Sequence, residues 1–214
     1  MNKNSTIKES GFDRKIHWEN VYSDKIATEV SWYQQCPENS LNLILATGIE
    51  KSASIIDIGG GASTLVDFLL TAEYQNISVL DISGSAIEQA KQRLGKHANK
   101  VNWIEQDITS FVAEQKFDVW HDRAVFHFLT DADDRSQYVK SMSRSLQSGS
   151  HAIIATFNLD GPEKCSGLDI VRYSTESLSE IFSENFKLIE TKTEEHKTPG
   201  GKSQSFVYCR FVRV

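Results

Sequence analysis

The fold of this chain is constrained most by an alternation of short apolar segments with amphipathic segments from about residue 54 onward. The apolar segments have the length of strands, and they lie at 54–58, 77–81, 101–105, 117–121 and 151–157. The amphipathic segments carry apolar residues at helical spacing, and they lie at 63–73, 83–97 and 133–146. This alternation is typical of a parallel sheet covered by helices, so we predict an α/β fold.

The C-terminal part of the chain follows a different pattern. After a helix expected near 175–183, two strand-like segments at 186–195 and 205–214 are joined by a connection with a Pro-Gly-Gly turn signal that begins at Pro199. Strands joined by a tight turn are antiparallel neighbours. We therefore expect a mostly parallel sheet with one reversed strand at its C-terminal side.

We expect residues 1–214 to form a single domain, because the sequence shows no internal repeat, low-complexity tract or linker. Residues 54–214 form the predicted core, and residues 1–50 form a predicted helical and aromatic cap. The cap has a helix expected over 40–47, and its large aromatic residues are Trp18, Tyr22, Trp32 and Tyr33.

Charge and cysteine usage bear on partners and location. The formal net charge is −6 and no dense Lys/Arg run occurs, which disfavours a nucleic-acid partner. Cys36, Cys165 and Cys209 are far apart, which favours a reducing compartment over a disulfide framework or a zinc site. A polar N-terminus and the lack of an apolar run of about 20 residues indicate neither a signal peptide nor a membrane span. The expectation is a soluble, cytoplasmic protein with no membrane partner.

The segment IIDIGGGAST, residues 55–64, has the pattern of a strand, a glycine loop and the start of a helix. Gly59, Gly60 and Gly61 allow the backbone to approach a ligand closely, and Ser63 lies where the helix N-terminus presents unpaired N–H groups. Asp57 begins the loop and is well placed beside a cationic ligand. Taken alone, such a loop is nonspecific, since many nucleotide sites use one.

Acidic residues at the ends of the next two predicted strands narrow the choice of ligand. Asp81, followed by Ile82, lies about 20 residues after the loop, where a carboxylate can accept hydrogen bonds from both hydroxyls of a ribose. Asp107 ends the third strand, where it can reach an adenine amino group while Ile108 packs on the ring. Thr64 lies where the dinucleotide-binding fingerprint has its third glycine or an alanine, which disfavours a nicotinamide cofactor.

With these motifs in order, the chain resembles the class I methyltransferases that depend on S-adenosylmethionine (SAM). The resemblance rests on DIGGGAS, VLDIS, EQDIT and FDVWHDRAVFHFL, and it extends from about Ile55 to the C-terminus. It implies a Rossmann-like three-layer sandwich, a seven-stranded sheet with an antiparallel last strand, SAM as cofactor and methyl transfer. It also implies that Tyr22 and Trp32 screen the cofactor as part of a lid, and that Asp122 and Arg123 lie beside it.

The residues that would serve the methyl acceptor are less defined. The chain lacks the Asn/Asp-Pro-Pro-Tyr tetrad common in methyltransferases that act on nucleobase or glutamine amino groups. His121 and His127 are candidate general bases, and Tyr173 lies in a long loop of the kind that often carries function. Structural roles for both histidines remain open alternatives. A metal site formed by His121, Asp122 and His127 is not expected.

Three functional readings remain after this sequence argument. The favoured one is methyl transfer from SAM to a small-molecule acceptor by in-line displacement, with a protein lysine as the second acceptor. A SAM-binding module without activity is not excluded by the residues. A nicotinamide-dependent dehydrogenase is disfavoured by Thr64 and by the position of Asp107.

Overall fold

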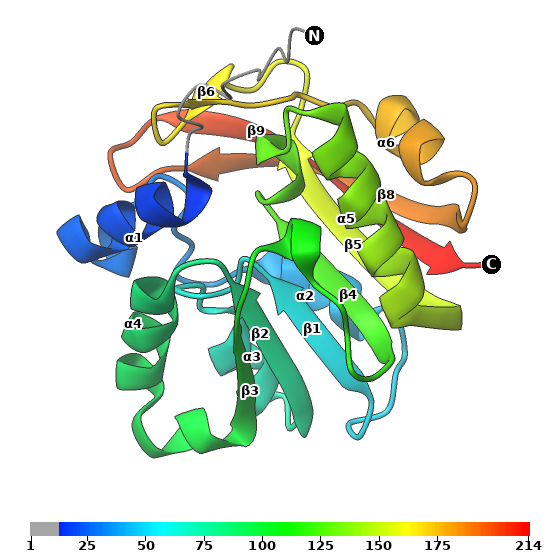
Figure 1. Ribbon diagram of the computed structural model, residues 1–214, viewed down its shortest axis with the longest axis horizontal. Coiled ribbons are helices and arrows are strands. Elements are labelled where there is room, and N and C mark those ends of the chain that lie inside the picture. Colours follow the sequence, from blue (N-terminus) through cyan, green and yellow to red (C-terminus); the bar gives the residue numbers. More distant parts are fainter. Residues whose placement is uncertain (1–12) are drawn as a thin grey trace, which may run out of the picture.

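The computed structural model of the protein, which describes residues 13–214, is built around a seven-stranded sheet of order β3-β2-β1-β4-β5-β9-β8 (Figure 1). Strands β3, β2, β1, β4 and β5 are parallel, and β9 is antiparallel to both of its neighbours, β5 and β8. The predicted reversed strand is therefore confirmed. The bounds are β1 Ser54–Ile58, β2 Asn76–Asp81, β3 Val101–Glu105, β4 Phe117–Arg123, β5 Leu146–Phe157, β8 Phe186–Lys197 and β9 Ser203–Arg213.

Helices cover both faces of the sheet, because alternate residues of each strand point to opposite sides. Ile55 of β1 packs with α2 and α3 on one face, and Ile56 packs with α5 and α6 on the other. The result is the predicted three-layer sandwich. The α-helices are α1 Arg14–Asp24, α2 Glu38–Leu45, α3 Leu65–Thr71, α4 Gly84–Leu94, α5 Ala132–Ser145 and α6 Thr175–Phe182.

Short elements fill the connections between these helices and strands. A small hairpin, β6 Lys164–Cys165 and β7 Leu168–Asp169, lies in the long loop after β5. Four short 3-10 helices complete the described chain: η1 Ala27–Glu29, η2 Gly95–Lys100, η3 Ile108–Ser110 and η4 Phe126–Phe128. Over residues 13–214, no helix is both long and apolar enough to cross a membrane.

The predicted segments exist in the structure, but several of their ends differ. Helix α3 begins at Leu65 rather than at residue 63, because the glycine loop continues through Ser63. Helix α4 ends at Leu94, since Gly95 takes a φ of 54° that an α-helix cannot continue. Strand β5 begins at Leu146, directly after α5, and not at residue 151.

The N-terminal segment lies against the edge of the sheet where the parallel strands end. Helix α1 packs against α4, and the connection from α1 to α2 brings Trp32 beside β4 (Figure 1). Residues 1–12 of the predicted cap lie outside the described residues. The cap boundary at residue 50 and the single-domain assignment stay predictions.

Candidate active site

Two adjoining cavities lie at the carboxyl ends of the parallel strands. The first is bordered by the ends of β2 and β3, and its lining includes Asp81, Ile82, Asp107 and Ile108. The second is bordered by the glycine loop and α2, and its lining includes Asp57, Gly60, Ser63 and His121. The cavities are contiguous, because they share Tyr22, Trp32, Ile58, Gly59 and Arg123. This is the edge at which open parallel sheets bind ligands.

The loop Gly59–Gly61 has no room for side chains beside the carboxylates of Asp57 and Asp81. Gly59 has a φ of 66°, a conformation that favours glycine. A Cβ on Gly60 would collide with Asp57 Oδ2, and a Cβ on Gly61 would lie 2.6 Å from Asp81 Oδ2. The loop and the carboxylates of Asp57 and Asp81 are therefore packed as one unit.

Asp81 is a buried acid oriented by the backbone. Its Oδ2 accepts a hydrogen bond of 2.9 Å from the Gly61 N–H, and its Oδ1 accepts one of 2.9 Å from the Ser83 N–H. Burial raises the pKa of Asp81 to about 6, although these two hydrogen bonds oppose the shift. Each carboxylate oxygen retains a lone pair, so the group can still accept hydrogen bonds from a ligand in the first cavity.

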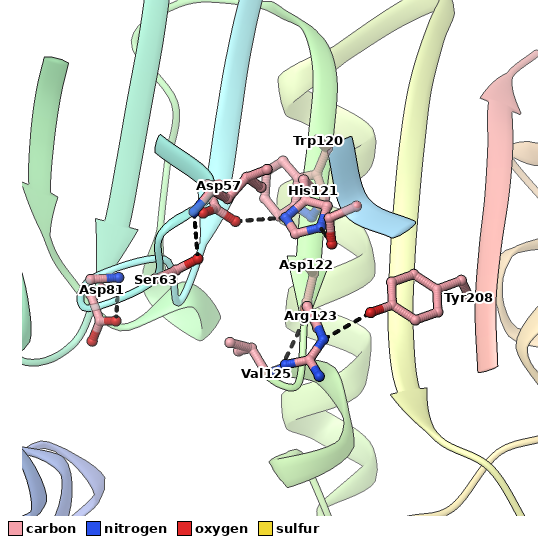
Figure 2. A network of polar contacts seen from close by, with 12 residues as sticks. Asp57, Ser63, Asp81, Trp120, His121, Asp122, Arg123, Val125 and Tyr208 are labelled. Carbon is pink, nitrogen blue, oxygen red and sulfur yellow. Dashed lines mark hydrogen bonds and ion pairs between the residues drawn. The ribbon is translucent and has the colours of Figure 1, made fainter. Parts of the chain in front are cut away.

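Asp57 and His121 form a buried pair beside the second cavity (Figure 2). Asp57 Oδ1 lies 2.6 Å from His121 Nδ1, and His121 Nε2 lies 2.8 Å from the hydroxyl oxygen of Ser40. Both ring nitrogens of His121 are thus used within the protein. The structure supports a role for His121 in orienting Asp57 more than the predicted role as general base. Asp57 Oδ2 is buried and has no hydrogen-bond partner among the described residues.

Asp107 and Ile108 line the first cavity at the end of β3. Asp107 Oδ1 accepts hydrogen bonds of 2.8 Å from both the N–H and the hydroxyl of Thr109. Asp107 Oδ2 lies 3.4 Å from Nη1 of Arg14 on α1. The acid is therefore held at the cavity wall, where it also ties α1 to the sheet.

Strand β4 divides its polar residues between the two faces of the sheet (Figure 2). Arg123 faces the cavities and lines both of them. Asp122, predicted beside the cofactor, instead points into the core, where it accepts hydrogen bonds from the Val125 N–H (2.9 Å) and the Tyr138 hydroxyl (2.6 Å). Burial raises the pKa of Asp122 to about 6. Its contacts support the loop after β4 rather than a ligand.

His127 and Tyr173 are not brought to the cavities. His127 is fully buried, its Nδ1 accepts a hydrogen bond of 3.2 Å from the Phe157 N–H, and burial lowers its pKa to about 3. Tyr173 is 4% exposed, and burial raises its pKa to about 12. Of the side chains described, neither lines the first or the second cavity. A base that serves a bound acceptor must reach it, so the structure supports structural roles for both residues.

Aromatic residues from the N-terminal segment lie at the junction of the cavities, and Tyr22 and Trp32 line both of them. Trp32 Nε1 donates a hydrogen bond of 3.2 Å to the Tyr22 hydroxyl. Trp18 packs edge-on against Trp32 and Phe128, with ring centroids 5.7 Å and 4.9 Å apart. Phe128 was missed in the sequence, since it lies in an apolar run that equally fits the core.

Other site residues also lack a sequence signal. Ser40 lies on α2, and Arg14 lies on α1, far from any motif. Over the part of the chain that the structure describes, no group of three or more His, Cys, Asp or Glu residues has the arrangement of a metal site. The polar side chains that line the two cavities include the carboxylates of Asp57, Asp81 and Asp107, the guanidinium groups of Arg14 and Arg123, and the His121 ring.

Comparison with known proteins defines the class. Residues 49–207 match the family model described as a methyltransferase domain, so this chain belongs to the methyltransferase domain family. Of its relatives, malonyl-[acyl-carrier protein] O-methyltransferase 1 of Ilyobacter polytropus is 27% identical over 157 residues, with 68% of this chain and 57% of that protein covered. Nodulation protein S of Rhizobium tropici is 25% identical, with 53% of this chain and 47% of that protein covered. The chain thus spans about half the length of these two relatives.

A third relative aligns along nearly the whole chain. Human EEF1A lysine methyltransferase 2 is 24% identical, with 92% of this chain and 84% of that protein covered. Among solved structures, the N-methyltransferase NodS of Bradyrhizobium japonicum in complex with S-adenosyl-L-homocysteine (SAH) has a TM-score of 0.69 at 19% identity, with 94% of this chain and 99% of that chain covered. A SAM-dependent methyltransferase of Anabaena variabilis has a TM-score of 0.71 at 14% identity, with both chains fully covered. These structural likenesses establish the Rossmann-like methyltransferase fold.

Proposed function

We propose that this chain transfers a methyl group from SAM to a small-molecule acceptor. The observation that carries this proposal is the set of three acids, Asp57, Asp81 and Asp107, at the ends of consecutive strands around a bare glycine loop. A sulfonium nucleoside with a free amino group needs hydrogen-bond acceptors and negative charge at these points.

The residues present fit SAM on two observations of this structure. Asp57 Oδ2 is a buried acceptor without a hydrogen-bond partner within residues 13–214, which suits an ammonium group. A side chain on Gly60 or Gly61 would fill the space beside the acids. We propose that Asp81 and Ile82 hold the ribose, that Asp107 and Ile108 hold the adenine, and that Gly59, Gly60, Gly61 and Ser63 surround the methionine end.

When bound, SAM supplies an electrophilic methyl group on a good leaving group. The protein's own contribution is alignment of the acceptor and exclusion of water. Trp18, Tyr22, Trp32 and Phe128 provide an apolar and aromatic cover suited to both tasks. Since both His121 nitrogens are engaged and His127 is buried, we propose that the acceptor arrives with its lone pair free.

The class of acceptor remains a proposal. A small acceptor group is supported by the name of one relative, a malonyl-[acyl-carrier protein] O-methyltransferase, and an N-methyltransferase, NodS, shares the fold. A protein lysine is the second candidate, because the human EEF1A lysine methyltransferase aligns with 92% of this chain. The net charge of −6 speaks against a nucleic acid. The spacing of three cysteines without a disulfide supports a reducing, cytoplasmic location.

The test is acceptor-dependent release of SAH. The purified chain is incubated with SAM and with separate panels of small carboxylates, small amines and lysine-containing peptides. We expect turnover with a small molecule that is lost in Asp81→Ala. Turnover with the lysine-containing peptides alone would identify a protein lysine, and not a small molecule, as the methyl acceptor. A folded chain that binds SAH but turns over no acceptor would be a SAM-binding module without activity.

A further inference from the structure

Residues 31–34, which we call the strap, lie between η1 and α2 and carry Trp32 to the junction of the two cavities. The strap is neither helix nor strand, so each of its carbonyl groups needs a donor of its own. Three of its four carbonyl groups accept a hydrogen bond from a side chain of another element. These donors are 30, 91 and 165 residues away in sequence, so distant parts of the fold hold the strap in place.

The two ends of the strap are held by different elements. At one end, His196 Nε2 of β8 donates a hydrogen bond of 2.8 Å to the Ser31 carbonyl. At the other end, the Thr64 hydroxyl, directly before α3, donates one of 2.9 Å to the Gln34 carbonyl. The Gln34 side chain donates a further hydrogen bond of 2.8 Å to Glu194 Oε1 of β8. Strand β8 thus contacts the strap at two points, although no residue of this strand, which the structure describes in full, lines either cavity.

The centre of the strap is held by Arg123 of β4. Its Nη1 donates a hydrogen bond of 3.0 Å to the Trp32 carbonyl. Its Nε donates one of 2.8 Å to the Tyr208 hydroxyl of β9 (Figure 2), and its guanidinium carbon lies 4.2 Å from the centre of the Phe206 ring. In the strand register, Arg123 is paired with Ala155 of β5, and Ala155 is paired with Tyr208. The small side chain of Ala155 leaves room for Arg123 to cross β5 and reach β9.

Tyr208 and Glu194 orient the Arg123 guanidinium. The Tyr208 hydroxyl accepts from Arg123 Nε and donates a hydrogen bond of 2.7 Å to Glu194 Oε2. Glu194 Oε2 also lies 3.6 Å from Arg123 Nη2. The side chains of Arg123 and Glu194 are 9% and 15% exposed, so their attraction is screened less than that of a surface pair. Glu194 therefore acts on the strap twice, through Arg123 and directly through Gln34.

We propose that Glu194 and Tyr208 of the C-terminal strand pair, β8 and β9, are positioning residues that hold the strap closed over the bound cofactor through Arg123. This inference rests on the proposed function and concerns how long the ligand stays bound. Because Trp32 Nε1 also donates to the Tyr22 hydroxyl, the position of the strap determines the position of the aromatic cover. The two antiparallel strands thus have a task at the site without touching the ligand.

The physical consequence is a slow release of the ligand. Trp32 lines both cavities, so a ligand that fills them leaves when the strap moves away. That movement breaks the hydrogen bonds from Arg123, His196 and Gln34, and the weakening of any of them makes it easier. Differences among variants of one site appear mostly in the dissociation rate. The dissociation rate of SAH is therefore the quantity that reports on the strap.

The experiment compares two glutamates of β8 by surface plasmon resonance. In Glu194→Gln, we expect SAH to dissociate about 3- to 10-fold faster, because hydrogen bonds to a charged group are weakened. Glu190→Gln is the matched control, since Glu190 lies on the same strand and pairs with Arg210 at 2.8 Å. Neither Glu190 nor Arg210 lines a cavity, so this variant should change the rate by less than about twofold.

Two further readouts separate positioning from a general loss of stability. In the ligand-free protein, the Tyr33 amide, which donates a hydrogen bond of 3.1 Å to the Val30 carbonyl, should exchange its hydrogen at least about threefold faster in Glu194→Gln than in Glu190→Gln. In a Trp32→Ala background, Glu194→Gln should add less than about twofold to the SAH dissociation rate, because the strap no longer carries a ring over the ligand.

Three results would overturn the proposal. The first is an equal SAH dissociation rate in Glu194→Gln and Glu190→Gln. The second is an equal exchange rate of the Tyr33 amide in these two variants. The third is a full effect of Glu194→Gln in the Trp32→Ala background, which would show that Glu194 acts on the ligand by another route.

If Glu194→Gln fails to fold, the comparison uses His196→Ala and His196→Gln. A glutamine amide can donate to the Ser31 carbonyl as the imidazole does, so His196→Ala should release SAH faster and His196→Gln should restore the wild-type rate. Equal rates in these two variants would contradict the proposal. Failure of the wild type to bind SAH would instead refute the proposed function, and the hydrogen-exchange comparison would still decide whether β8 holds the strap.

Discussion

At the scale of single residues, strand β4 shows what a sequence can and cannot reveal. Asp107, Asp81 and the glycines were recognisable because each follows an apolar run at a characteristic spacing. His121, Asp122 and Arg123 were equally recognisable as polar residues of a strand. The sequence did not show to which face of the sheet each of them projects. A central parallel strand is buried on both faces, so no alternation of polar and apolar residues marks which side meets the ligand.

The buried Asp81 predicts a pH dependence of cofactor binding. Its pKa is raised to about 6 by burial, and its ionised form is the better acceptor for ribose hydroxyls. We expect SAH affinity to fall by up to about tenfold per pH unit below about pH 6. Calorimetry of the wild type and of Asp81→Asn over about pH 5 to 8 checks this, and the variant should lose the dependence.

The raised pKa of Asp81 has the opposite effect on the ligand-free protein, where lower pH increases stability. A folded pKa of about 6 against 3.8 for the free side chain means that folded Asp81 binds its proton more tightly. Its contribution to the free energy of unfolding therefore increases as pH falls through about 6 towards 3.8. Urea unfolding of the wild type and of Asp81→Asn measures the difference between them. An equal pH profile for both proteins would contradict the assignment.

The space around Gly61 predicts the effect of adding a single side-chain atom, the Cβ. A Cβ at this position would lie 2.6 Å from Asp81 Oδ2 and 2.7 Å from the Ala86 Cβ. Gly61→Ala should therefore displace the Asp81 carboxylate and weaken SAH binding by about tenfold or more. The control is Gly200→Ala, because a Cβ there would meet no atom closer than 3.9 Å. Similar affinities for the two variants would show that the loop tolerates side chains.

At the scale of elements, the acidic residue Glu19 of α1 contacts the N-terminus of α4. Glu19 Oε1 accepts a hydrogen bond of 2.6 Å from the Gly84 N–H, and Glu19 Oε2 accepts one of 3.1 Å from the Ser85 N–H. Burial would raise the pKa of Glu19, but the hydrogen bonds from α4 outweigh it and lower the pKa. A carboxylate at the N-terminus of a helix is also favoured by the helix dipole.

This attachment predicts the effect of Glu19→Gln. The amide loses the charge and one of the two acceptor oxygens, at a cost of about 1 kcal/mol. Because α1 carries Trp18 and Tyr22 over the cavities, we expect SAH to dissociate several-fold faster. Surface plasmon resonance measures the dissociation rate, with Asp24→Asn at the exposed end of the same helix as control. Equal rates in the two variants would argue that α1 does not retain the ligand.

The elements themselves were largely predictable, and their ends were not. The strand at residues 54–58 was placed correctly, since the β-branched apolar residues Ile55, Ile56 and Ile58 occupy three of its five positions. The start of β5 at Leu146 was missed, because Gln147, Ser148 and Gly149 read as a loop although the strand passes through them. Pairing with β4 and β9 determines such ends, and pairing involves residues distant in sequence.

At the scale of the whole molecule, the order of the elements determines the site. The parallel strands end at one edge, and the N-terminal segment crosses that edge between α1 and α2 (Figure 1). The cofactor edge was predictable, because it follows from topology. The hydrogen bonds of Arg123 to Trp32 and of Gln34 to Glu194 (2.8 Å) were not predictable, since their partners lie 91 and 160 residues apart in sequence.

Ligand binding should stabilise the folded chain as a unit. At about 100 times its Kd, SAH adds about 2.7 kcal/mol to the free energy of unfolding. For a chain of this size, this corresponds to a rise in Tm of about 5 to 11 °C. Differential scanning calorimetry should find this shift with SAH and a much smaller one with free adenine. The absence of any shift at saturating SAH would be incompatible with the site.

The central claim is that the acids around the glycine loop bind SAM. It is tested most directly by titration calorimetry of SAH into the wild type and into Asp81→Ala, with circular dichroism to establish that the variant is folded. The account predicts saturable binding to the wild type and a loss of about 10- to 100-fold in affinity in the variant. Unchanged affinity in a folded Asp81→Ala protein would contradict it.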